Sequence, residues 1–323
     1  HIAIYEQGGV SQLFGIALHT VPNKDDGTFA VTGAKYSLAA ALESRGGGED
    51  PHSSRPAVVA LENTHNKASG AVLPLAFIDA VAGVCKEAGV KLHMDGARLM
   101  NAVAASGVSA ARIVRDCDTV SLCLSKGLGA PVGSVIAGSA DFVARARRLR
   151  KVLGGGMRQA GVVAASGIVG LREHAKALGA DHAKAKSLAR GLALVRGIIV
   201  HPTRVHTNIL YFDIDPAVLS TAKLLARVAA GAGAAAPAAA TAADASPYSS
   251  EPAAAPSPPA LPPTITAATP PATAFAAALE AAGHIKVGVY SATRMRAVTH
   301  HQIRDEDVDT FLATAASVAS WMS

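Results

Sequence analysis

The stretch that decides the fold is Cys117–Ser134, CDTVSLCLSKGLGAPVGS. Residues 118–124 are rich in β-branched and apolar side chains, a composition that is typical of a short buried strand. This pattern ends at Ser125-Lys126-Gly127, and more glycines follow in the next six residues. The sequence therefore predicts a lone lysine where an apolar strand meets a glycine-rich turn. Open α/β sheets bind their ligands at this end of their parallel strands.

Lys126 has two interpretations. Burial at a strand end would disfavour the ammonium form, and a free amine can form a Schiff base with an aldehyde. The surrounding glycines would then let the backbone approach a flat ligand closely. The alternative is a solvated loop lysine, which is the usual state of an isolated Ser-Lys-Gly sequence.

Polar residues also follow two earlier predicted strands. The apolar run 57–61 leads into Glu-Asn-Thr-His-Asn at 62–66, and the run 90–94 leads into Asp-Gly-Ala-Arg at 95–98. Helical spacing between these runs predicts the order strand, helix, strand, helix, strand, which requires parallel strands with right-handed crossovers. We therefore expect three polar clusters, the third being Ser125-Lys126, to converge on one edge of the sheet.

The remaining pattern predicts two domains. Residues 1–190 form a large α/β domain with a mostly parallel sheet, in which residues 1–15 give a short strand and a turn. Residues 191–323 form a small C-terminal α+β domain, interrupted at 231–273 by a low-complexity insertion of Ala, Pro, Ser and Thr. The first domain starts directly in a structured segment, so we expect its N-terminal part to be missing.

Composition excludes several classes of protein. The chain has 323 residues, a net charge of +6 and a pI near 9.3, but basic and aromatic residues do not alternate as in a nucleic-acid surface. No apolar run is long enough to span a membrane. The three cysteines lack the spacing of a disulfide framework or a zinc site. We expect no metal, no nucleic-acid or membrane partner, and a reducing compartment, either cytoplasmic or organellar.

An aldehyde cofactor on Lys126 would need further groups, and pyridoxal 5'-phosphate (PLP) is the obvious candidate. Asp95 could pair with its pyridine nitrogen or could simply cap a helix. Arg98 could lie near the cofactor's phenolic oxygen or the substrate, or form a plain ion pair. His65 could be a general base or a hydrogen-bonded loop residue. His1 could stack on the ring or be a frayed terminus.

Three basic segments are candidate anion sites. Arg158 follows three glycines at the predicted start of a helix, which is a favourable place for a phosphate. The cluster at 145–151, ending in Lys151, is either an anion site or a solvated helix face. Arg294 and Arg296 lie on a predicted strand, where one of them could bind a substrate carboxylate with both guanidinium arms. The alternative for each of them is a surface salt bridge.

Several long motifs resemble one family. The chain is similar to low-specificity L-threonine aldolases, PLP enzymes with the aspartate-aminotransferase-like fold. The resemblance covers residues 1–211 and resumes near 284. The motifs that carry it are HIAIYEQGG, LENTHN, HMDGARLMNAV, CLSKGLGAPVGSVIAG, GGGMRQAG and RAVTH.

The resemblance implies roles for individual residues. Lys126 would form the internal Schiff base, Asp95 would pair with the pyridine nitrogen, and His1 would stack on the ring. His65 would lie near the substrate's β-hydroxyl, and Arg296 would bind its carboxylate. Three further basic residues would lie near the cofactor: Arg98 at the phenolic oxygen, and Arg158 and Lys151 near the phosphate or a subunit boundary.

The implied reaction is the cleavage of L-threonine or L-allo-threonine to glycine and acetaldehyde, by a homodimer or homotetramer. Family members also carry a phosphate-binding loop before the position of His1. Two alternatives stay open. One is another PLP-dependent lyase of the same fold, and the other is an inactive truncated homologue that acts only as an interaction module.

Overall fold

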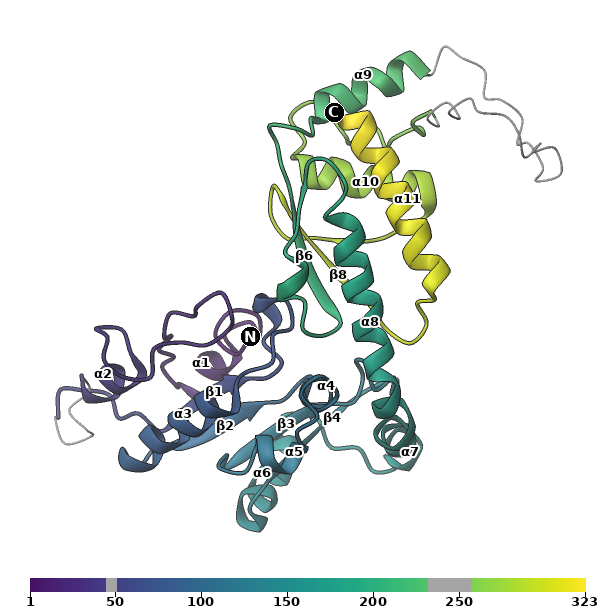
Figure 1. Cartoon of the computed structure of the whole chain (residues 1–323). Coiled ribbons are helices and arrows are strands. Elements are labelled where there is room, and N and C mark those ends of the chain that lie inside the picture. Colours follow the sequence, from purple (N-terminus) through teal and green to yellow (C-terminus); the bar gives the residue numbers. More distant parts are fainter. Residues whose placement is uncertain (45–50, 232–256) are drawn as a thin grey trace. The chain divides into compact units, whose positions relative to one another are not determined.

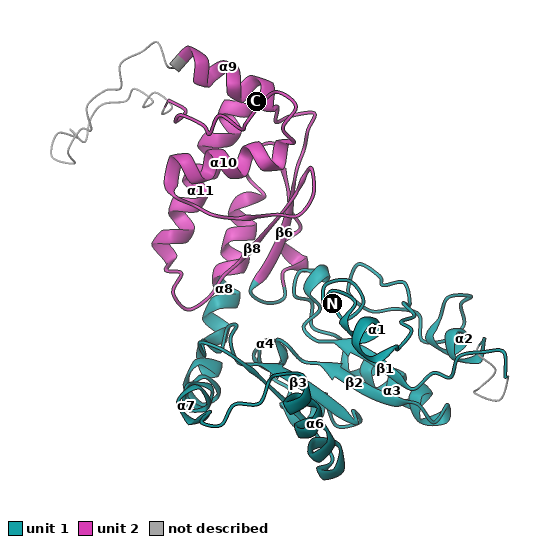
Figure 2. Ribbon diagram, turned by 180° about the vertical axis from the view of Figure 1, so that it is seen from behind, with its two compact units in different colours: residues 1–183, 206–208 teal, residues 184–205, 209–323 magenta. Residues whose placement is uncertain are grey.

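The computed structural model describes residues 1–44, 51–231 and 257–323 (Figure 1). These residues form two compact units (Figure 2). Unit 1 contains His1–Ala183 and His206–Asn208, and unit 2 contains Lys184–Val205 and Ile209–Ser323. The boundary therefore falls within a helix near residue 183, whereas the sequence pattern suggested about 190. The expected insertion at 231–273 lies mainly outside the described residues.

Unit 1 is built on a four-stranded sheet in the order β1-β2-β3-β4. The strands are β1 (Val58–Glu62), β2 (Lys91–Asp95), β3 (Thr119–Cys123) and β4 (Ser134–Gly138). The first three are parallel, as expected. β4 was not foreseen: it pairs antiparallel with β3, so that the glycine-rich turn closes a hairpin.

Helices cover one face of this sheet. They are α3 (Leu75–Glu87), α4 (Leu99–Ser106) and the short α5 (Ala110–Ile113). The buried side chains of Leu61, Leu92 and Met94 project from this face of β1 and β2. They pack in one core with Ile78 and Val81 of α3. Because side chains alternate along a strand, Glu62 and Asp95 leave the opposite face.

The other helices of unit 1 come before and after the strands in the chain. α1 (Gly9–Phe14) and α2 (Leu38–Glu43) lie in the N-terminal part, whereas α6 (Ala140–Val152) and α7 (Gly161–Val169) follow the hairpin. A π-helical turn at Gly170–His174 leads directly into α8 (Ala175–Leu192). The predicted strand in residues 1–15 is wrong, because turns and α1 occupy this segment.

Unit 2 contains an antiparallel sheet in the order β5-β6-β8-β7. Its strands are β5 (Ile198–Ile199), β6 (Ile209–Ile214), β7 (Gly288–Val289) and β8 (Arg294–Val298). The helices α9 (Thr221–Gly231), α10 (Pro271–Gly283) and α11 (Asp305–Met322) share a core with β6 that includes Phe212, Phe275 and Trp321. The α+β arrangement expected for residues 191–323 is observed within the described residues.

Candidate active site

The carboxyl end of β1 holds His1 in place. The imidazole Nδ1 of His1 lies 2.9 Å from both carboxylate oxygens of Glu62, the last residue of the strand. The His1 ring also lies 4.7 Å from the ring of Tyr5, centroid to centroid. His1 is thus anchored at the strand end and is not a frayed terminus in this structure.

His65 begins a single 3₁₀ turn, Asn66–Ala68, directly after this strand. Its Nδ1 accepts a hydrogen bond from the backbone N–H of Ala68 at 3.3 Å. Burial lowers the pKa of the half-buried imidazole below its usual value, against an opposing effect of the nearby Glu62 carboxylate. The ring is therefore neutral near pH 7, and because Nδ1 accepts, its proton lies on Nε2.

Asp95 ends β2 beside Glu62, its register partner on β1. Its Oδ1 accepts a hydrogen bond from the backbone N–H of Ala97 at 3.1 Å, and this is the one hydrogen bond of the carboxylate among the described residues. The N-cap of α4 is Arg98, so Asp95 does not cap that helix. The half-buried carboxylate keeps Oδ2 available to a ligand.

Lys126 lies in the β3–β4 hairpin. The backbone N–H of Gly129 donates to the Lys126 carbonyl at 2.8 Å, and Leu124 and Gly133 close the loop with a 3.0 Å bond. Lys126 is exposed, which matches the alternative of a solvated loop lysine and not the buried position of the other interpretation. Its hairpin follows β3, the strand next to Asp95, so both residues lie at the same edge of the sheet.

The hairpin rests on packed groups from other parts of unit 1. A Cβ added at Gly127 would lie 2.9 Å from the Leu178 side chain of α8 and 3.9 Å from the Asn101 amide of α4. Asn101 is itself buried and contacts His182 Nε2 at 3.0 Å and Asn208 Oδ1 at 3.4 Å. A side chain at the position after the lysine would therefore require Leu178 to move.

The other predicted basic residues lie in different surroundings. Arg98 is half-buried at the N-cap of α4, beside Asp95. Arg158 and Lys151 are both exposed, and α7 begins at Gly161 and not at Arg158 as expected. The turn after α6 folds back tightly, since a Cβ on Gly156 would lie 2.7 Å from Lys151 Cδ. Their roles at a phosphate or a subunit boundary stay predictions.

Arg294 and Arg296 lie on β8 of unit 2 and differ clearly. Arg294 forms a two-armed ion pair with Asp213, with its shortest N–O distance 2.8 Å. This is the structural alternative considered for both arginines. Arg296 is half-buried opposite Tyr211 of β6, and it remains the candidate for the substrate carboxylate.

Two residues near the candidate active site, Glu62 and His93, were given no role by sequence reasoning. Glu62 was noted only as part of a strand end, although it contacts His1. His93 lies on the same sheet face as Asp95, with Nδ1 2.8 Å from Thr119 Oγ1, and burial lowers its pKa. The alternation of His93 with buried Leu92 and Met94 was a signal for this placement.

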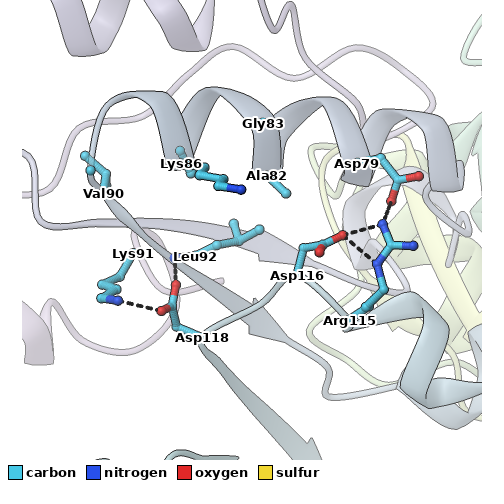
Figure 3. Close-up of a pocket in the computed structure, with 12 residues that line it drawn as sticks. Asp79, Ala82, Gly83, Lys86, Val90, Lys91, Leu92, Arg115, Asp116 and Asp118 are labelled. Atoms are coloured by element: carbon cyan, nitrogen blue, oxygen red, sulfur yellow. Dashed lines mark hydrogen bonds and ion pairs between the residues drawn. The ribbon is translucent and has the colours of Figure 1, made fainter.

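A cavity of about 490 Å³ lies elsewhere in unit 1, where β2 and β3 begin (Figure 3). Four of its charged side chains form two pairs: Lys91 with Asp118 at 2.8 Å, and Arg115 with Asp116 at 2.7 Å. It is lined by Asp79, Lys86 and the residues just named, among others. Because it opens at the amino ends of the parallel strands, it is separate from the candidate active site. Among the described residues there is no cluster of potential metal ligands.

The fold and this site define a class. A mostly parallel sheet with an acid and a lysine at neighbouring strand ends, followed by an α+β unit, is the architecture of the fold-type I PLP enzymes. The alignment with the structure of a threonine aldolase from Leishmania major covers 99% of this chain and 75% of that chain. Its TM-score is 0.65, and the two sequences are 20% identical. At that identity the likeness establishes the fold alone.

The family follows from the sequence comparison. Residues 1–215 match the model of the beta-eliminating lyases, and the chain belongs to this family. It is 44% identical over 227 residues to "Low-specificity L-threonine aldolase 1" of Arabidopsis thaliana, covering 70% of this chain and 62% of that protein. Against "Low specificity L-threonine aldolase" of Escherichia coli it is 36% identical over 211 residues, or 65% and 59% of the two chains. The chain thus spans about 60% of the length of these relatives.

Enzymes of this family use PLP, and the polar edge of unit 1 fits this group. Asp95 uses Oδ1 for the backbone N–H of Ala97, so Oδ2 could pair with the pyridine nitrogen, and the side chain of Lys126 is exposed. At the end of β1, two buried polar atoms, Asn63 Nδ2 and Thr64 Oγ1, have no hydrogen-bond partner. Buried polar groups without a partner are uncommon, and they are expected beside ligand sites.

Proposed function

We propose that this protein is a PLP-dependent lyase that cleaves L-threonine or L-allo-threonine to glycine and acetaldehyde. The observation that carries the proposal is the sheet register: Asp95 lies beside Glu62, which anchors His1, and the hairpin of Lys126 follows the next strand. The likeness to two low-specificity threonine aldolases supports the choice of substrate.

When bound, PLP supplies an aldehyde for an amine and a ring that accepts the electron pair released when the Cα–Cβ bond breaks. Lys126 Nζ would provide that amine, and Asp95 would keep a proton on the ring nitrogen. His1 would stack its imidazole on the cofactor ring. Arg98 would hold the phenolic oxygen and Arg158 the phosphate.

The remaining residues act on the substrate. Arg296 binds the carboxylate and so orients the amino acid. His65 lies at the β-hydroxyl, whose proton must leave as the Cα–Cβ bond breaks. In the neutral ring Nε2 carries the proton, so this nitrogen could only donate a hydrogen bond to the hydroxyl oxygen. For His65 to take the hydroxyl proton, the ring must release the Ala68 N–H and turn Nδ1 toward the substrate, where the transfer would leave an imidazolium.

The proposal is tested with the full chain, PLP and L-threonine. We expect equal amounts of glycine and acetaldehyde. The family also contains enzymes that eliminate a β-substituent, and that reaction would give 2-oxobutanoate and ammonia instead. If a folded protein with bound PLP forms neither set of products, this result would favour the inactive interaction module.

We also propose that the protein assembles as a homodimer or homotetramer and works in a reducing compartment, where its glycine would enter amino-acid metabolism. Large apolar side chains are exposed along the segment 132–171, including Val135 and Ile136 on β4 and Val162 on α7. Exposed apolar patches commonly mark interfaces. Light scattering after size-exclusion chromatography measures the subunit number. No helix in the described part of the chain is apolar and long enough for a membrane crossing.

A further inference from the structure

The carboxylate of Glu62 contacts two separate parts of unit 1, and no role has been assigned to it so far. It accepts a hydrogen bond from the backbone N–H of Asn66 at 2.9 Å, and it lies 2.9 Å from His1 Nδ1. The side chain of Glu62 is only 14% exposed. One carboxylate thus joins the N-terminal segment to the turn after β1.

Glu62 and Asp95 are direct register partners on adjacent parallel strands. Their side chains leave the same face of strands that lie about 4.8 Å apart, and like charges in this arrangement repel. Glu62 is compensated by His1 and by Asn66, whereas Asp95 has a single backbone donor. The two carboxylates therefore have different tasks: one holds protein groups, and the other remains available to a ligand.

The same carboxylate also holds the 3₁₀ turn that begins after His65. By fixing Asn66 N–H it fixes the first residue of the 3₁₀ turn that His65 caps. On the other side the ring is confined by Gly27, where an added Cβ would lie 2.8 Å from His65 Cγ. The charged groups that act on His65 are Glu62, Lys67, Asp26 and the α-ammonium group of His1.

We propose that Glu62 is a positioning residue that holds the imidazoles of His1 and His65 together at the polar edge of the sheet. An ionised carboxylate is an acceptor only, so His1 Nδ1 carries the proton that they share. The geometric part of this inference concerns the protein alone, and its effect on catalysis rests on the proposed function.

The first test is an NMR titration of the histidine ring protons in the full chain without cofactor. His1→Gln and His65→Gln assign the two signals. Glu62→Gln keeps the size of the side chain but removes its charge. We expect the His1 titration midpoint to fall by about 0.5–1 pH unit, because an opposite charge in contact favours the imidazolium form. The His65 midpoint should fall by less.

Glu87→Gln is the matched control, because Glu87 is an exposed residue at the end of α3. It removes the same charge and should leave both midpoints unchanged. An unchanged His1 midpoint in folded Glu62→Gln would overturn the proposal. If that variant does not fold, Glu62→Asp decides: its shorter side chain cannot reach both His1 and Asn66, and an unchanged midpoint would again overturn it.

The second test is the pH profile of threonine cleavage in the holoenzyme. We expect Glu62→Gln to lower kcat several-fold and to shift the acidic limb of kcat/KM, with little change in bound PLP. If wild-type protein does not cleave threonine, the proposed function fails, and the NMR titration still decides the role of Glu62. If wild type is active and the variant keeps both kcat and the pH profile, the positioning role is wrong.

Discussion

For the residues at the carboxyl ends of β1, β2 and β3, some properties come from the residue type and others from the surrounding structure. The side chain of Lys126 is exposed in this structure, and the neighbouring Gly127 lies close to Leu178 of α8. What the structure gives the lysine is therefore its place in the hairpin that follows β3. In the presence of PLP, the cofactor itself would cover the amine.

Lys126→Ala should abolish the visible absorbance of PLP bound to the full chain, since no other amine is assigned to the aldehyde. Cleavage of threonine should fall by at least about 10³-fold, the range found when a covalent catalyst is removed. Absorbance spectra and an acetaldehyde assay measure both effects. Lys86→Ala on α3 is the control, because Lys86 lines the separate cavity. Retained absorbance of equal intensity in Lys126→Ala would show that the assignment is wrong.

Arg296→Ala should raise KM for threonine by about 10-fold or more, because a charge-assisted pair with a carboxylate contributes about 1.5–3 kcal/mol. PLP affinity should change little. Arg294→Ala on the same strand removes the ion pair with Asp213, so it should affect stability and leave KM nearly unchanged. An unaltered KM in Arg296→Ala would remove Arg296 from the carboxylate site.

At the scale of the elements, close approach of backbones decides where glycine is required. Gly96, directly after β2, would place a Cβ 2.6 Å from the carbonyl oxygen of Ser121 on β3. Gly83 lies within α3 and has open space around its Cβ position. The same substitution should thus have opposite effects at these two sites.

Gly96→Ala should lower the free energy of unfolding by about 1–3 kcal/mol, since overpacking forces backbone shifts. It should also displace Asp95 and weaken PLP binding. Gly83→Ala should raise the free energy of unfolding by about 0.5–1 kcal/mol, because alanine is the better helix former. Urea denaturation measures both. Equal stability of the two variants would contradict the close approach of β2 and β3.

The whole chain should lose stability in mild acid. Burial lowers the pKa of His65 and of His93 below the ordinary value of 6.5. Below that pH the unfolded chain binds more protons than the folded one, so stability is fully present above about pH 6.5 and falls as the pH drops through this window. Asp79 and Asp118 have lowered pKa values and act in a separate window, below their ordinary 3.8.

Urea denaturation at about pH 7 and about pH 5 tests this dependence. Both histidines belong to unit 1, so circular dichroism is the suitable signal, because Trp321 is buried in the core of unit 2. His93→Gln should reduce the loss of stability on acidification, whereas His300→Gln on unit 2 should not. A wild-type protein that is equally stable at both pH values would refute the assignment.

Much of the architecture could be predicted from local pattern. The apolar runs before Glu62, Asp95 and Lys126 identified three parallel strands, and alternation with helices fixed their direction. β4 was missed because all five residues of SVIAG are exposed, so no buried face marks the segment as a strand, and only its pairing with β3 defines it. The strand expected in residues 1–15 did not form, since its few alternating residues have no neighbouring strand to pair with in the described structure.

The sequence by itself determined the family, the parallel direction of the first three strands and the candidate residues, because hydrophobic periodicity and long motifs are local properties. The tertiary structure alone decided that the Glu62 carboxylate contacts the His1 imidazole, that His65 is neutral and caps a 3₁₀ turn, and that Arg294 forms an ion pair with Asp213. These features depend on distances between side chains far apart in the chain and on the burial that folding creates.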